Sequence, residues 1–210
     1  MKKEIAKLMR GFKEFQKNVY NTKGSVYEEL SKGQSPKTLV IGCSDSRVDP
    51  AHLSSTDPGE LFVVRNVANL VPPFEEPVGS LHGVSAAIEF AVVNLKVEYL
   101  FILGHRQCGG IKALLFPEET QAGGFVQQWM SIAESAKQRT LETLNTDDAT
   151  ELCRHCEKEG VRVSIENLKT FPFVAKALDE GTLKILGLYF DLETGELWSL
   201  DHENSEFQLV

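Results

Sequence analysis

Two short apolar runs, each followed directly by residues of metal-ligand type, constrain this chain more than any other feature. The run at 38–42 leads into Cys43, and the run at 99–104 leads into His105. Runs of this length, rich in branched side chains and ended by glycine, are typical of buried strands. If the two strands are parallel neighbours, the residues that follow them meet at one sheet edge, where open α/β sheets bind ligands.

Cys43, His105 and Cys108 together offer two thiolate sulfurs and one imidazole nitrogen. Zinc binds such atoms in a tetrahedral shell, and three protein ligands leave a fourth position for water, which marks a catalytic site. Gly109 and Gly110 directly follow the last ligand and allow backbone to approach closely. A lone cysteine more often packs as a small apolar residue. The combination instead predicts one zinc ion per chain.

Apolar periodicity along the rest of the chain predicts an α/β fold with a central, mostly parallel sheet flanked by helices. About four strands are expected, plus one antiparallel edge strand formed by a hairpin. The strands are expected at 38–42, 61–64, 99–104 and 183–190, with the edge strand at 197–200. A long helix is expected at 152–168, where Gly160 predicts a kink or break.

Residues 1–33 form a predicted helical arm ahead of a zinc-binding α/β core at 34–210, within one domain of 210 residues. Five apolar side chains of the arm recur at helical spacing and form one seam. They are Ile5, Leu8, Phe12, Phe15 and Val19. This seam needs a cover, which is either the rest of its own domain or a second copy of the chain.

The overall charge and the cysteine content limit the classes of partner and compartment. A formal charge of −8 argues against a general nucleic-acid or anionic membrane surface. No apolar run is long enough to span a membrane, and the N-terminus lacks the apolar core of a secretory signal. Two of the four cysteines are expected to bind zinc, which favours a reducing cytoplasm over a disulfide framework. We therefore expect a cytoplasmic protein without nucleic-acid or membrane partners.

Several motifs together resemble the β-class carbonic anhydrases, over most of the chain from about residue 34. The motifs are Cys43-Ser44-Asp45-Ser46-Arg47, Pro58-Gly59-Glu60, the run 62–69 and Gly104-His105-x-x-Cys108-Gly109-Gly110. The plant-type branch of the class is favoured by Gly33-Gln34-Ser35-Pro36, Val71-Pro72-Pro73 and Ala86-Ala87-Ile88-Glu89. The resemblance implies reversible hydration of carbon dioxide to bicarbonate by zinc-bound hydroxide. It also implies a homodimer or a higher multiple of dimers, with the arm packed across the dimer.

Asp45 and Arg47 are expected to control the open zinc position. A free carboxylate competes for the metal, whereas a charge-assisted fork to arginine holds it away and leaves an oxygen to accept a proton. The resemblance implies this same role.

The resemblance also implies a small apolar slot for the substrate. Gln34 is the expected donor to a substrate oxygen, and Phe62, Val67 and Gly83 are expected to shape the slot. Phe90 stands where the plant-type pattern has tyrosine, so the slot keeps a ring and loses a hydroxyl.

Two other functions remain open. The same zinc chemistry would serve a hydrolase of a related cumulene such as carbon disulfide, and the domain would also suit a non-catalytic zinc-stabilised interaction module. Cys153 and Cys156 flank His155 like half of a zinc knuckle, but no second Cys/His pair lies nearby in the sequence, so these thiols are expected to pack in the fold.

Two thiolate ligands donate more charge to zinc than imidazoles do, which raises the pKa of a water molecule bound to the metal. We therefore expect turnover to rise with pH above neutrality.

Overall fold

The computed structural model describes residues 2–79, 81–201 and 205–210. The chain divides into two compact units, Met1–Ser35 and Pro36–Val210. The first unit contains α1 (Lys3–Phe15), a π-helical turn (Gln16–Tyr20) and α2 (Tyr27–Leu30). No residue of α1 is buried, and its predicted apolar seam is largely exposed, with Leu8 at 74% and Phe12 at 58%.

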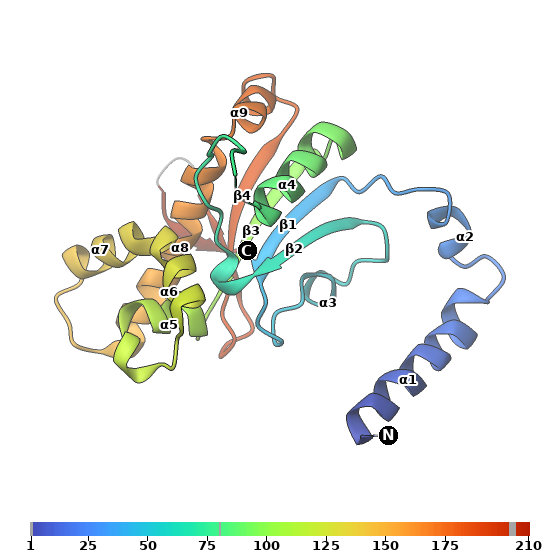
Figure 1. Ribbon diagram of the computed structural model, residues 1–210, viewed down its shortest axis with the longest axis horizontal. Helices are drawn as coiled ribbons and strands as arrows, with labels where there is room; N and C mark the ends of the chain where they lie inside the picture. The colour runs from blue at the N-terminus through green and yellow to red at the C-terminus, as the bar shows by residue number, and fades with distance from the viewer. Residues whose placement is uncertain (1, 80, 202–204) are drawn as a thin grey trace. The chain divides into compact units, whose positions relative to one another are not determined.

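The second unit is built on a six-stranded sheet in the order β2-β1-β3-β4-β5-β6 (Figure 1). The strands are β1 (Thr38–Cys43), β2 (Leu61–Asn66), β3 (Tyr99–His105), β4 (Lys184–Phe190), β5 (Leu197–Leu200) and β6 (Phe207–Leu209). The first four run parallel, while β5 and β6 are antiparallel to their neighbours. The predicted mostly parallel α/β sheet is confirmed, and β6 adds a short strand that the sequence pattern did not indicate.

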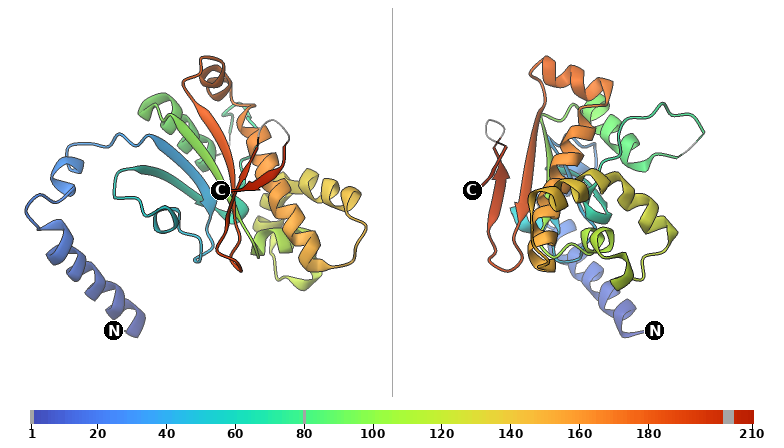
Figure 2. Two further views of the ribbon diagram at one scale, coloured as in Figure 1. Left: turned by 180° about the vertical axis from the view of Figure 1, so that it is seen from behind. Right: turned by 90° about the vertical axis from the view of Figure 1, so that its left-hand side faces the viewer.

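Helices connect the four parallel strands, and several of them cover one face of the sheet. The α-helices are α3 (Pro50–Ser54), α4 (Gly83–Glu89), α5 (Gly109–Leu115), α6 (Gly124–Met130), α7 (Glu134–Thr143), α8 (Ala149–Leu168) and α9 (Pro172–Asp179). Short 3-10 turns occur at Val67–Asn69, Pro117–Glu119 and Ser131–Ala133, and α4 continues as a π-helical segment, Phe90–Leu95. In the right-hand view of Figure 2, α4, α8 and α9 lie on the same side of the sheet.

The main core lies between that face of the sheet and these helices. Leu39 and Ile41 of β1 are fully buried there, as are Ile88 of α4 and Val161 of α8. Helix α8 runs continuously through Gly160, so the break expected there is absent. Gly160 is buried within the packed helix, where a Cβ would lie 3.5 Å from Ile111. Tertiary packing therefore outweighs the low helix propensity of glycine at this position.

The parallel arrangement places two strand ends side by side. Strands β1 and β3 are hydrogen-bonded neighbours, and they end at Cys43 and His105 respectively. The expected meeting of the two ligand-bearing segments at the carboxyl edge of the sheet is therefore present. Among the described residues, no helix is both long and apolar enough to cross a membrane.

Candidate metal centre

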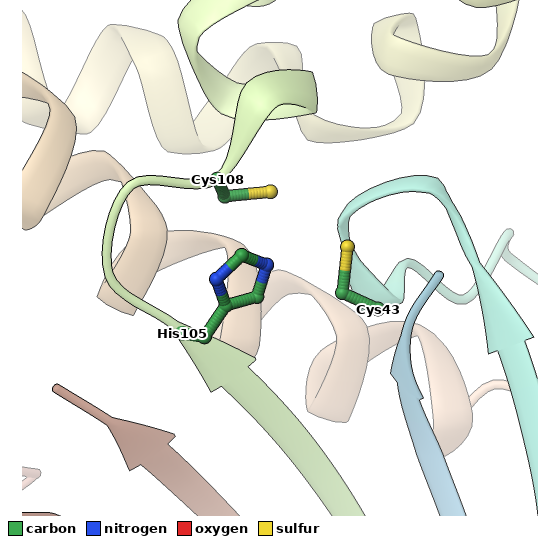
Figure 3. A group of neighbouring side chains, drawn as sticks. All are labelled: Cys43, His105 and Cys108. Atoms are coloured by element: carbon green, nitrogen blue, oxygen red, sulfur yellow. The ribbon is translucent and has the colours of Figure 1, made fainter. Parts of the chain in front are cut away.

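Three side chains of metal-ligand type converge at this sheet edge. One ligand atom each from Cys43, His105 and Cys108 lies within 4.8 Å of the other two, and all three residues are buried. Figure 3 shows the side chains pointing toward one another from the end of β1, the end of β3 and the turn before α5. Across the described part of the chain, no other group of three such residues is this close.

The imidazole of His105 has one nitrogen engaged and one free. Nδ1 lies 2.8 Å from the backbone oxygen of Arg106, and because a carbonyl only accepts, Nδ1 must carry the proton. That leaves Nε2 with a lone pair, and this atom is buried without a hydrogen-bond partner. Buried polar atoms are rarely left unpaired. A metal ion bound at Nε2 would satisfy it, so the imidazole fits a zinc site.

The two sulfurs of the cluster interact closely. Contact with the Cys108 thiol lowers the pKa of Cys43, and the His105 imidazole adds to the effect. The same contact and burial raise the pKa of Cys108. The Cys43 thiol is thus the easier of the two to deprotonate. Because thiolate is the form that binds metals, this donor set also suits zinc.

Asp45 and Arg47 form the predicted fork on the segment that follows Cys43. Arg47 donates from Nε to Asp45 Oδ1 at 3.0 Å and from Nη2 to Oδ2 at 2.8 Å. The backbone N–H of Arg47 also donates to Oδ1, at 2.9 Å. The side-chain hydrogen bonds from Arg47 hold the pKa of Asp45 well below its usual range. The carboxylate is therefore ionised, and each of its oxygens accepts at least one hydrogen bond from Arg47.

Arg65 holds the backbone of the same segment. Its Nε donates to the Cys43 carbonyl at 2.9 Å, and its Nη2 donates to the Asp45 carbonyl at 2.6 Å. Its Nη1 pairs with Asp49 at 2.8 Å. One side chain from β2 thus fixes the turn that carries both the candidate ligand Cys43 and the Asp45 carboxylate.

Two residues next to the cluster, Glu157 and Tyr189, were not predicted from the sequence. Glu157 of α8 accepts a hydrogen bond from the Cys108 backbone N–H at 2.9 Å and another from the Tyr189 hydroxyl at 2.8 Å. Burial raises the pKa of Glu157 to about 7. Glu157 is one of several charged residues on α8, so the local sequence does not distinguish it from the others. Its contact with Cys108 depends on the packing of α8 against β3 and β4.

The predicted substrate-binding residues lie in different places. Val67 directly follows β2 and lies close to the segment that follows Cys108. A Cβ added at Gly110 would lie 2.8 Å from Cγ1 of Val67. Phe62 and Phe90 pack together with ring centroids 5.8 Å apart. Phe62 pairs with Leu39, four positions before Cys43, so it lies about 13 Å back along the strand. The structure thus places Val67, but not this ring pair, near the cluster of its own chain.

The other two predicted pocket residues have less defined surroundings. Gly83 begins α4, and a Cβ there would meet nothing within 4 Å. Gln34 belongs to the first unit, Met1–Ser35, and its substrate contact stays a prediction.

The half zinc knuckle on α8 does not form a three-ligand cluster in the described chain. Cys153 and Cys156 lie on α8 with the intervening His155, whose Nδ1 lies 3.1 Å from the Thr140 hydroxyl. Burial raises the pKa of Cys153 to about 11 and that of Cys156 to about 12. These thiols stay protonated near neutral pH, in keeping with the packing role expected for them.

Comparison with known proteins agrees with this geometry. The sequence model of the carbonic anhydrase family matches residues 38–197, which include all three cluster residues. The chain belongs to the carbonic anhydrase family. This assignment makes the protein an enzyme of the carbonic anhydrase type, and it confirms the resemblance carried by the sequence motifs.

The relatives place the chain within the β class of carbonic anhydrases. It is 37% identical over 206 residues to beta carbonic anhydrase 3 of Arabidopsis thaliana, covering 96% of this chain and 79% of the relative. The solved structure of the β-carbonic anhydrase CcaA aligns with a TM-score of 0.92 at 30% identity, covering 100% of this chain and 93% of that one. A tetrameric β-carbonic anhydrase of Sordaria macrospora aligns at 0.76 and 29% identity, covering 94% and 93%.

Proposed function

We propose that this carbonic anhydrase interconverts carbon dioxide and bicarbonate with one zinc ion held by Cys43, His105 and Cys108. The observation that carries the proposal is the convergence of two sulfurs and an unpartnered imidazole nitrogen in a buried cluster. When bound, zinc would act as a Lewis acid that lowers the pKa of a water molecule at its fourth position.

Asp45 would keep that position available and assist the attacking water. Its oxygens are committed to Arg47, so the carboxylate is held back from the metal. Oδ1 accepts two hydrogen bonds and Oδ2 accepts one. Oδ2 therefore has a lone pair left to accept a hydrogen bond from the water that attacks carbon dioxide. This contact would orient the nucleophile.

The substrate contacts complete the proposal. Gln34 would donate to a substrate oxygen, while Phe62, Val67, Gly83 and Phe90 would line an apolar slot that suits a small apolar molecule. The ring pair of Phe62 and Phe90 lies apart from the cluster of its own chain, so its place in the slot would require a second copy of the chain; Phe90 is 44% exposed.

The wider setting of the enzyme is also a proposal. The protein would work in the cytoplasm, where thiols stay reduced. It would form a homodimer or a multiple of dimers, which the tetrameric relative supports. Residues 1–33 would act as the arm of a single domain whose zinc-binding core is 34–210.

Stopped-flow hydration of carbon dioxide by metal-quantified protein tests the proposal. Activity is expected to scale with zinc content and to rise with pH above neutrality. Cys43→Ser should lose both zinc and activity, whereas Cys153→Ser, a matched change outside the cluster, should keep both. Zinc binding without turnover of carbon dioxide would instead identify an interaction module, and turnover of carbon disulfide alone would identify the hydrolase.

A further inference from the structure

Arg47 has a second side-chain partner besides Asp45. Its Nη1 donates to the side-chain oxygen of Gln107 at 3.1 Å, and its Nη2 donates to the backbone oxygen of Gln107 at 3.2 Å. Gln107 lies between His105 and Cys108. The guanidinium therefore links the two segments that carry the candidate ligands.

Gln107 has an unusual backbone conformation. Its φ is +59°, in the left-handed region that residues other than glycine seldom adopt. Such conformations persist where the surrounding structure holds them, and they gather at functional sites. In this conformation both carbonyl oxygens of Gln107 contact the same guanidinium.

The amide nitrogen of Gln107 is anchored at its other side. Nε2 donates to Glu193 Oε1 at 3.0 Å, in the turn between β4 and β5. Glu193 Oε2 lies 2.9 Å from Arg106, which also pairs with the buried Asp191 at 3.1 Å. Because the oxygen of the amide faces a donor and its nitrogen faces a carboxylate, neither contact survives a flip of the amide. Gln107 is thus braced between the C-terminal hairpin and Arg47.

We infer that Gln107 is a positioning residue that holds Arg47 in its fork with Asp45 and so keeps the Asp45 carboxylate off the metal. This inference rests on the proposed function of the cluster. The side chain of Arg47 is 47% exposed, and a long exposed arginine has many accessible rotamers. Two further hydrogen bonds, donated by Arg47 to the fixed Gln107, favour the rotamer that meets Asp45. Without them, Arg47 turns into solvent more often and Asp45 competes for the open metal position.

The test uses cobalt-substituted full-length protein, with azide as a probe of the open position read from the visible spectrum. Gln107→Asn suits the left-handed backbone, but its shorter amide cannot reach both partners. We expect it to bind azide about tenfold more weakly, the loss expected for a hydrogen bond to a charged group. Cobalt content should be unchanged. Glu193→Ala should act in the same direction, whereas Glu193→Gln keeps an acceptor and should resemble the wild type.

A double-substitution cycle separates positioning from general damage. In an Asp45→Asn background no carboxylate competes, so Gln107→Asn should change azide binding by less than about twofold. Gln121→Asn, a matched change of an exposed glutamine, should have no effect. The positioning role of Gln107 would be refuted if Gln107→Asn left azide affinity unchanged, or if it lowered azide affinity equally in the Asp45→Asn background. Neither result would contradict the proposed function. A wild-type chain that holds no cobalt would refute the proposed function as well.

Discussion

Asp45 shows how the neighbours of a single carboxylate decide its role beside a metal. Arg47 engages both of its oxygens, and Arg65 fixes the carbonyl of the same residue. An exposed ion pair of this kind usually contributes about 0–1 kcal/mol to stability. Its importance here is geometric, because it determines where an ionised group points.

Replacing Arg47 with alanine should release the Asp45 carboxylate toward the metal. We expect kcat/KM for carbon dioxide hydration to fall about 10- to 100-fold, the range seen when residues that orient a metal site are removed. Zinc content should stay the same. Stopped-flow assays of protein with measured zinc content check both points.

A matched arginine provides the control for that experiment. Arg139 is also partly exposed and forms a comparable fork with Glu166, donating from Nη1 and from Nη2 at 2.8 Å each. Arg139→Ala should keep nearly full turnover. Full activity in Arg47→Ala would contradict the role given to the fork.

At the scale of elements, the contact of α8 with β3 and β4 positions the segment that carries Cys108. A Cβ at Gly104 would lie 2.6 Å from Val161 of α8, and one at Gly187 would lie 2.9 Å from the same side chain. Glycine on the strands therefore lets the helix approach closely. The same contact brings Glu157 to the backbone of Cys108.

Gly104→Ala should push α8 away from the sheet. We expect the free energy of unfolding to fall by about 2 kcal/mol, as overpacking a tight core usually costs. Urea denaturation of the variant and the wild type in the same metal state measures the loss.

Val161→Ala in the same chain should recover part of that loss, because it removes the methyl group that clashes. Gly124→Ala serves as a comparison, since a Cβ there would meet nothing within 4 Å. Strictly additive effects of Gly104→Ala and Val161→Ala would show that the two positions do not press on each other.

At the scale of the whole molecule, each of the two units leaves apolar surface uncovered. The seam of α1 is exposed, and in the second unit an apolar groove of about 420 Å³ lies on the sheet face opposite α8. Val40, Phe101 and Leu188 are among its lining residues. Large exposed apolar surfaces on a folded chain commonly mark contacts with another protein. Both surfaces therefore agree with the proposed assembly of several copies.

Charges placed on the arm should weaken that assembly. Leu8→Glu combined with Phe12→Glu puts two carboxylates on the exposed seam, and we expect a smaller species by sedimentation velocity because burial of these charges is costly. Lys7→Glu makes the same change in net charge off the seam and should leave the assembly intact. An unchanged sedimentation coefficient in the double variant would show that the seam is not an interface.

The amino-acid order by itself determined the sheet, the edge where ligands gather and the three residues that meet there. Apolar runs ended by glycine are local signals, and parallel neighbours bring their ends together wherever they occur. The same order did not reveal β6, whose three residues are too short for a periodic pattern.

Only the tertiary structure decided what surrounds that cluster. Glu157 reaches Cys108 across 49 positions and Arg47 reaches Gln107 across 60, and contacts at such separations leave no periodic trace in a single sequence. The left-handed turn at Gln107 is likewise invisible in the sequence, because glutamine carries no preference for it. Residue type thus identifies the candidate ligands, whereas tertiary packing determines how those ligands and the Asp45–Arg47 pair are oriented.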